Sequence, residues 1–139
     1  MSMELFTSFD AQVEKMQKQN KQYIDVFEEY LKIQNLSEKT IRQHIEHIDF
    51  YINEFLCHYE PKEMCVGCYE LSAFFSPFGI GKDVCTSEYN VSLYSASIKK
   101  FYKLMCEKGF IKAEDYQHLL KSLKIEKECW IDELKHGWK

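Results

Sequence analysis

The fold of this chain is decided at Leu36-Ser37-Glu38-Lys39-Thr40-Ile41-Arg42-Gln43-His44, which joins two segments with helical apolar periodicity. Ser37 is the predicted N-cap of the second helix, because its hydroxyl can accept a hydrogen bond from a backbone N–H that the first helical turn leaves unpaired. Leu36 and Ile41 have the spacing of a hydrophobic staple across that cap. The stretch therefore predicts two helices joined by a short turn.

Apolar residues recur at intervals of three, four and seven on both sides of this junction, which is the pattern of amphipathic helices. The polar stretch 17–22 predicts a break in the first helix near Asn20, and Gly109 is predicted to end a later helix. The predicted helices cover residues 8–34, 37 to between 56 and 59, 65–78, 90 or 92 to 109, 113–123 and 126–135, with a loop at 82–90.

Composition favours an all-α fold. The chain has 139 residues, of which 45% are hydrophobic, so one domain can bury a core. It has only five Gly and two Pro, and this scarcity of helix breakers favours a single-domain bundle of five to six helices over a turn-rich sheet protein. No apolar run approaches the ~20 residues of a membrane span, and the N-terminus lacks the pattern of a secretory signal. We therefore expect a cytoplasmic protein with no membrane contact and with reduced cysteines.

The junction also carries a resemblance to a known family. Residues 23–124 resemble the core-binding, SAM-like domain of tyrosine recombinases, the phage integrase family. The resemblance rests on Phe27-Glu28-Glu29-Tyr30-Leu31, on the Leu-Ser-x-x-Thr junction at 36–40, and on Ser97-Ile98-Lys99-Lys100-Phe101-Tyr102-Lys103-Leu104-Met105 followed by Lys108-Gly109-Phe110-Ile111. It implies a SAM-like core at 21–124, with an N-terminal helical extension at 1–20 and a C-terminal helix at 125–139.

The family's domain forms half of a clamp around DNA, so the resemblance implies double-stranded DNA as a partner. The family's catalytic domain, with its Arg/His set and Tyr nucleophile, would follow the present C-terminus. The sequence also has no Ser/His/Asp order, no Gly-rich phosphate loop and no paired-carboxylate motif, so we expect no catalytic residue, no cofactor and no enzyme activity. The residues that the resemblance places against the DNA backbone or grooves are Lys39, Thr40, Arg42, Gln43, Lys99, Lys100 and Lys103.

Charge leaves a second function open. The formal net charge is −4, whereas proteins that bind nucleic acid are usually basic because they neutralise phosphates. Residues 99–124 carry seven Lys and three acidic residues, but residues 21–56 carry four basic and seven acidic residues. Glu46 and Asp49 are expected on the same helix face as Arg42. The alternative function is therefore a protein–protein interaction or dimerisation module that does not bind DNA, in which the lysine face is solvated surface.

The cysteines offer a weak candidate for a zinc site, because thiolates and imidazole bind Zn²⁺ tetrahedrally. A single C-x-x-C pair, with Cys85 isolated, favours buried apolar cysteines instead, so we expect no metal. The histidines at 44 and 47 can share a helix face, but such residues on helix flanks are more often boundary groups than ligands. The weak zinc candidates are Cys57, His58, Cys65 and Cys68.

The aromatic residues are more numerous than a small core requires, with ten Phe, nine Tyr and two Trp. Most fall at inward helical positions and are expected in the core. Tyr and Trp bury much area with few rotatable bonds, so some of those that fall outside these positions are expected to form a partner surface, and a homodimer through them or through the N-terminal helix is expected. The residues outside these positions are Tyr51, Tyr59, Tyr89 and Trp138.

Overall fold

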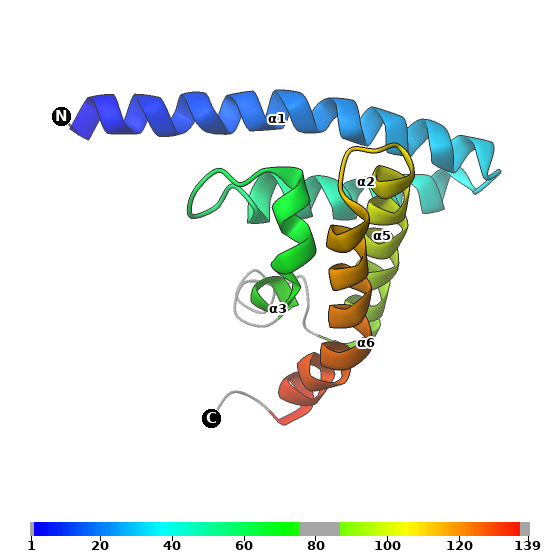
Figure 1. The fold of residues 1–139 in the computed structure, drawn as a ribbon. Helices are drawn as coiled ribbons and strands as arrows, with labels where there is room; N and C mark the ends of the chain where they lie inside the picture. Colours follow the sequence, from blue (N-terminus) through cyan, green and yellow to red (C-terminus); the bar gives the residue numbers. More distant parts are fainter. Residues whose placement is uncertain (1, 76–86, 137–139) are drawn as a thin grey trace. The chain divides into compact units, whose positions relative to one another are not determined.

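The computed structural model describes residues 2–75 and 87–136, with the side chains of 8–75 and 87–135. Every regular element in that part of the chain is helical and no strand occurs there, which confirms the all-α class. None of the helices described is long and apolar enough to cross a membrane. The chain divides into two compact units, unit 1 (residues 1–67) and unit 2 (residues 68–139). The elements are α1 (Ser2–Ile33), α2 (Glu38–Asp49), η1 (Phe50–Phe55), η2 (Met64–Tyr69), α3 (Leu71–Ala73), α5 (Glu88–Glu107) and α6 (Ala113–His136) (Figure 1).

α1 is one continuous helix, so the break expected near Asn20 is wrong (Figure 1). In the polar stretch 17–22 every side chain is exposed except that of Asn20, which is 2% exposed. Glutamine and lysine are good helix formers, so a polar run continues a helix as readily as an apolar one. After α1 ends, Asn35 adopts a φ of 60°, the left-handed conformation that asparagine tolerates at a helix C-terminus.

The N-cap predicted at Ser37 is confirmed. Its Oγ accepts a hydrogen bond from the backbone N–H of Thr40 at 3.2 Å. α2 continues directly into η1, a π-helical turn, so the second helix reaches its expected end near residue 56 without being a uniform α-helix. The core of unit 1 is built from fully buried side chains of α1, α2 and η1, namely Phe27, Leu31, Ile48, Tyr51 and Ile52.

Tyr51 belongs to this core, so its predicted place outside the inward helical positions is wrong. The side chain is fully buried, and its hydroxyl donates a hydrogen bond to the Gly67 carbonyl at 2.7 Å. Tyr51 lies three residues after the buried Ile48, so it falls within the helix face that this core covers. The buried face is wider than the isoleucine stripe alone indicates.

Two of the predicted surface tyrosines are exposed: Tyr59 in unit 1 and Tyr89 in unit 2. Trp138 lies outside the described residues. Neither unit by itself therefore shows a cluster built from these predicted aromatics among the residues described.

The prediction of one short helix at 65–78 is wrong. In the described part of that range the chain forms a 3-10 helix, η2, then α3, and then two π-helical residues at 74 and 75, while residues 76–78 lie outside the described residues. The sequence of η2 contains Gly67 and other weak helix formers, which explains why a longer α-helix does not form. α3 nevertheless packs on α6. Two residues after α3, Phe75 is fully buried and stacks on Trp130 of α6 with 4.8 Å between the ring centroids.

α5 begins earlier than expected, at Glu88, and Ser87 is its N-cap in place of Asn90 or Ser92. The Ser87 Oγ accepts a hydrogen bond from the backbone N–H of Asn90 at 3.1 Å. Of the loop expected at 82–90, residues 82–86 lie outside the described residues and residues 88–90 are helical.

The helix stop predicted at Gly109 is confirmed. Its φ is 79°, and the N–H of Phe110 donates to the Met105 carbonyl at 2.9 Å, as in a Schellman motif. The next two helices expected, at 113–123 and 126–135, are one helix, α6. No Gly or Pro lies between residues 113 and 136, so nothing in the sequence interrupts it. α5 and α6 pack side by side, joined by a short turn (Figure 1).

Candidate functional site

The seven residues predicted to contact DNA lie on two helices in two units. All are exposed except Thr40 and Lys100, which are half-buried. Each unit therefore has its own candidate surface. Lys39, Thr40, Arg42 and Gln43 lie in the first two turns of α2 in unit 1, and Lys99, Lys100 and Lys103 lie on α5 in unit 2.

The side chain of Thr40 takes part in the helix cap. The Ser37 hydroxyl accepts from the Thr40 backbone N–H and donates to Thr40 Oγ1 at 2.9 Å. This pair of hydrogen bonds holds the N-terminus of α2. Helix capping therefore explains Thr40 without a ligand.

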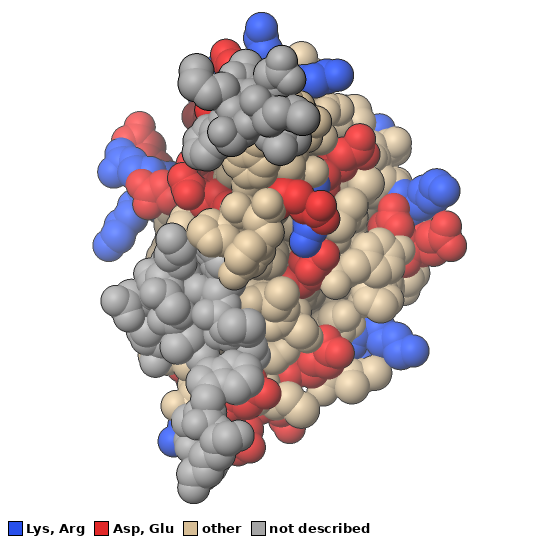
Figure 2. Space-filling view, turned by 90° about the vertical axis from the view of Figure 1, so that its left-hand side faces the viewer, with Lys and Arg blue, Asp and Glu red and all other residues tan. Residues whose placement is uncertain are grey.

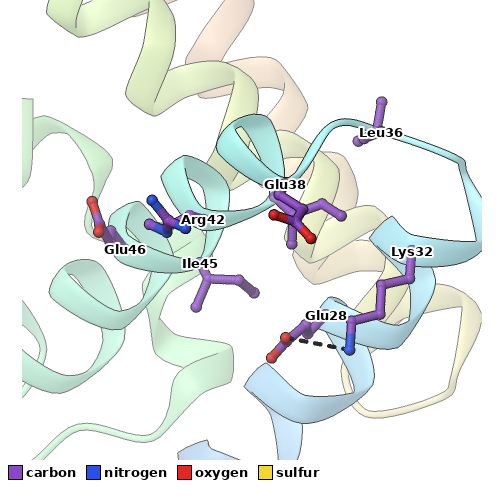
Figure 3. A pocket seen from close by; sticks show the side chains of 8 residues that line it. Glu28, Lys32, Leu36, Glu38, Arg42, Ile45 and Glu46 are labelled. Atoms are coloured by element: carbon purple, nitrogen blue, oxygen red, sulfur yellow. Dashed lines mark ion pairs between the residues drawn. The ribbon is translucent and has the colours of Figure 1, made fainter.

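Arg42 borders a hollow of about 660 Å³ between the end of α1 and the start of α2 (Figure 3). Glu38 and Glu46 lie four residues before and after Arg42 on α2, so both carboxylates share its helix face. A third carboxylate, Glu28 on α1, pairs with Lys32 at 3.6 Å. The apolar residues that line the hollow are Leu36, Ile41 and Ile45.

The charges of unit 1 do not favour a phosphate at this hollow, because an anion beside Arg42 would meet three carboxylates on the same rim. Unit 1 as a whole carries seven basic and twelve acidic residues, a balance of −5, whereas unit 2 carries eleven and ten, a balance of +1. In the view of Figure 2 the blue side chains are interspersed with red and tan ones and form no continuous basic patch. Of the two units, unit 2 is therefore better suited to a polyanion.

Lysines of unit 2 gather in a groove of about 480 Å³ between α5 and α6, which we call the lysine groove. Lys99 from α5 and Lys124 and Lys127 from α6 line it, and none of its lining residues is acidic. Within the described part of the chain, none of these three lysines forms an ion pair. Lys103 follows Lys99 by one turn on the same face of α5. The other lining residues are Ser92, Ser95, Ala96, Leu120 and Leu123.

The sequence prediction missed Lys124 and Lys127. They follow Leu120 and Leu123 at helical spacing, so all four share one face of α6. Dividing this segment into two helices hid that shared face. The absence of Gly and Pro between residues 113 and 136 is the signal that could have revealed it.

The weak zinc candidates Cys57, His58, Cys65 and Cys68 do not form a site in the part of the chain that the structure describes. There, no group of three or more His, Cys, Asp or Glu side chains could hold a metal ion. Cys57 is buried, and its thiol donates to the Ile52 carbonyl at 3.8 Å. Burial raises the pKa of Cys57, which favours the thiol over the metal-binding thiolate. Cys85 lies outside the described residues.

His44 and His47 pack into unit 1. The His44 ring lies against Phe27, with 6.3 Å between the ring centroids, and His47 is half-buried. Burial, with a smaller contribution from His44, lowers the pKa of His47 from 6.5 to about 4. His47 is therefore neutral at pH 7, and folding opposes its protonation.

The buried position of His47 predicts a loss of stability in mild acid. Because the folded state binds this proton less readily than the unfolded state, stability is fully present above pH 6.5 and falls as the pH drops toward about 4. Allowing for solvent screening of a half-buried group, we expect the loss to be about 1–2 kcal/mol. Urea denaturation across this pH range should show that His47→Gln loses less stability than the parent. Equal losses in both proteins would contradict the assignment.

No protein-family model, curated protein or solved structure matches this chain. The resemblance to tyrosine recombinases therefore stays a prediction from the sequence. The functional argument rests on the geometry and charge of the two units.

Proposed function

We propose that this chain is a non-catalytic helical protein that associates with double-stranded DNA through the lysine groove of unit 2. The observation that supports the proposal is that Lys99, Lys124 and Lys127 converge from two helices on a groove whose lining contains no carboxylate. Lysines held on a rigid helix pair can follow phosphates without reading bases. The contact would therefore be positional and sequence-independent.

The role of Arg42 in this proposal is smaller than the resemblance implies. The carboxylates of Glu38 and Glu46 on the same face of α2 would weaken any phosphate contact there. With Thr40 used in the helix cap, Lys39 and Gln43 are the remaining candidates in unit 1. We therefore assign the main contact to unit 2.

The proposal predicts a steep dependence of DNA affinity on salt. A short duplex, followed by fluorescence anisotropy, should bind most tightly at low salt and weaken strongly between about 50 and 200 mM, because each neutralised phosphate releases counterions. Replacing Lys99, Lys124 and Lys127 together by glutamine should reduce the slope of log K against log salt by about 2–3, since each phosphate contact contributes about 0.9.

The matched control replaces three exposed lysines of α1 by glutamine, which gives the same change in net charge. This control should keep the parent slope, because its lysines lie outside the groove. An equal loss in both triple variants would show that net charge alone is responsible. No binding by the parent at low salt would overturn the proposal. The control residues are Lys15, Lys18 and Lys21.

A second candidate function, a protein–protein interaction module, is favoured by the hollow in unit 1. Its lining mixes apolar residues with charges of both signs (Figure 3), which is the composition of a protein-binding surface rather than of a phosphate site. Ile33, at the end of α1, is 79% exposed and adds apolar surface to the same unit. If the parent fails to bind DNA at low salt, this function becomes the better supported one.

A further inference from the structure

α1 has a flank that unit 1 leaves partly uncovered. The buried side chains of this helix, Asn20, Phe27 and Leu31, lie on its core face. Ile33, in the last turn, is 79% exposed, and Val26 lies on the same side of the helix about two turns before it. Apolar side chains along the flank of a long helix indicate a surface that another element can cover.

A seven-residue repeat continues this flank along the helix. When the repeat is counted from Phe9, its first and fourth positions hold eight residues up to Ile33, of which two are glutamines and six are apolar or aromatic. Apolar residues at these two positions are the pattern of a helix that packs lengthwise on another helix. The repeat needs a helix that passes Asn20 without a break, and α1 does so. The eight residues, which we call the α1 seam, are all half-buried or exposed, namely Phe9, Gln12, Met16, Gln19, Tyr23, Val26, Tyr30 and Ile33.

The charges beside the α1 seam identify what covers it. Lys15, Gln22 and Glu29 follow one another at intervals of seven residues, so they flank the same edge of the seam, and all three are exposed. Lys15 forms no ion pair with any residue that the structure describes, and Glu29 lies 3.7 Å from Lys32 in a contact open to solvent. Lys15 and Glu29 are equally far from Gln22, on opposite sides of it. The edge is therefore complementary in charge to a second copy of itself, turned about Gln22.

The same charges give the direction of the second helix. In an antiparallel pair the edges that carry Lys15 and Glu29 lie beside each other, so each lysine meets a glutamate of the other copy. In a parallel pair each of these edges would lie beside the opposite edge, which carries Val13, Asn20 and Phe27 and offers no charge. Charge complementarity therefore selects the antiparallel arrangement.

We propose that a second copy of this chain covers the α1 seam, so that the protein forms a symmetric dimer through two antiparallel α1 helices centred near Gln22. Lys15 of each copy pairs with Glu29 of the other, and Ile33 of each copy packs on the other seam near Phe9. Residues 9–33 extend over about 37 Å of helix, which is long enough for three heptads of lengthwise contact. The dimer does not depend on the proposed function, because the seam belongs to unit 1 and the lysine groove to unit 2.

Sedimentation equilibrium of the full chain, over a range of protein concentrations, tests the dimer. A single pair of helices is a small interface, so we expect a dissociation constant of about 1–100 μM. Ile33→Glu should weaken the dimer by about 100-fold or more, because it would bury two charges in an apolar contact. The matched control, Ile125→Glu, adds the same charge at an isoleucine of unit 2 that is 61% exposed, and it should keep the parent dissociation constant.

An exchange of charges tests the antiparallel arrangement. Glu29→Lys should weaken the dimer by about 10-fold, because each of the two symmetric contacts would then bring two lysines together. Adding Lys15→Glu to the same chain should restore the parent affinity, since the two exchanged charges form both pairs again.

Each of these results decides the proposal. Circular dichroism should show the parent helicity in every variant, because all the replaced side chains are exposed, and this separates dissociation from misfolding. A parent that stays monomeric at about 500 μM would overturn the dimer. A dimer that Ile33→Glu leaves intact, or that Ile125→Glu weakens equally, would overturn the α1 seam as its interface. Failure of Lys15→Glu to rescue Glu29→Lys would overturn the antiparallel arrangement.

Discussion

Replacing Trp130 by alanine is expected to destabilise unit 2 by about 3–5 kcal/mol, the usual range for deleting a large buried aromatic side chain. Trp130 is 3% exposed and stacks on Phe75, with 4.8 Å between the ring centroids. Its Nε1 donates to the Ser72 hydroxyl at 3.2 Å, and that hydroxyl donates to Glu126 at 2.8 Å. One side chain of α6 thus contacts both a ring and a hydroxyl from the segment around α3.

The size of this effect follows from the contacts of Trp130 with the segment around α3. Ser72 lies within α3 and Phe75 lies two residues after it, so the side chain of Trp130 holds this segment against α6. Removing it should therefore release the segment around α3 as well as leave a cavity.

Trp130→Phe is the matched control. Phenylalanine keeps an aromatic ring against Phe75 but loses the donor to Ser72, so we expect a loss of about 1–2 kcal/mol. Urea denaturation followed by far-ultraviolet circular dichroism measures both variants without relying on tryptophan fluorescence. If Trp130→Ala lost no more stability than Trp130→Phe, the packing role would be contradicted.

The junction at residues 36–44 was predictable because its determinants are local. A serine three residues before the N–H that it caps can be recognised from the sequence alone, and the structure confirms that bond. The Gly109 stop was predictable for the same reason, since a φ of 79° strongly favours glycine. Caps and stops depend on a few neighbouring residues and little on the rest of the fold.

Errors arose where a residue is placed by partners distant in sequence. Tyr51 is fully buried, and the partner of its hydroxyl, the Gly67 carbonyl, lies sixteen residues away. The polar neighbours of Asn20 predict a helix break at this position. Its side chain instead donates hydrogen bonds to residues that lie 32 and 33 positions further along the chain. A helical pattern indicates which face is apolar, but it does not show which polar side chain finds a buried partner.

The part of the candidate site that depends on helical spacing alone was predictable. Lys99 and Lys103 share one face of α5 by spacing alone, and the flanking of Arg42 by Glu38 and Glu46 also follows from helical spacing. The lysine groove could be predicted only with the knowledge that α6 is unbroken and lies beside α5.

Asn20→Asp is expected to destabilise unit 1 by about 3 kcal/mol or more at pH 7, although the two side chains have nearly the same shape. Asn20 is 2% exposed, and its Nδ2 donates to the Ile52 carbonyl at 3.3 Å and to Asn53 Oδ1 at 2.8 Å. Asn53 in turn donates to Asp49 at 2.6 Å. A carboxylate at position 20 would place a buried charge against two oxygens and could donate to neither.

Asn20→Ala separates this effect from simple truncation. Alanine leaves the two acceptors without their donor but adds no charge, so we expect a loss of about 1–3 kcal/mol in urea denaturation at pH 7. Both variants should keep α1 helical up to residue 33, because the amide anchors the helix to η1 and does not set its helical propensity.

The pH dependence of the free energy of unfolding distinguishes the loss of a hydrogen-bond donor from a change in side-chain shape. Burial and the facing oxygens should raise the pKa of the introduced carboxyl in the folded state above its unfolded value near 3.9. The folded Asn20→Asp protein then binds this proton more readily than the unfolded chain does. Protonation therefore stabilises the variant at low pH, and this stabilisation is lost as the pH rises through the raised pKa. Relative to the parent at each pH, Asn20→Asp should therefore recover stability toward pH 4, because the protonated carboxyl can donate one hydrogen bond. The loss of stability in Asn20→Ala relative to the parent should stay constant with pH. A deficit of Asn20→Asp that did not change with pH would mean that side-chain shape, and not the amide donor, holds α1 against η1.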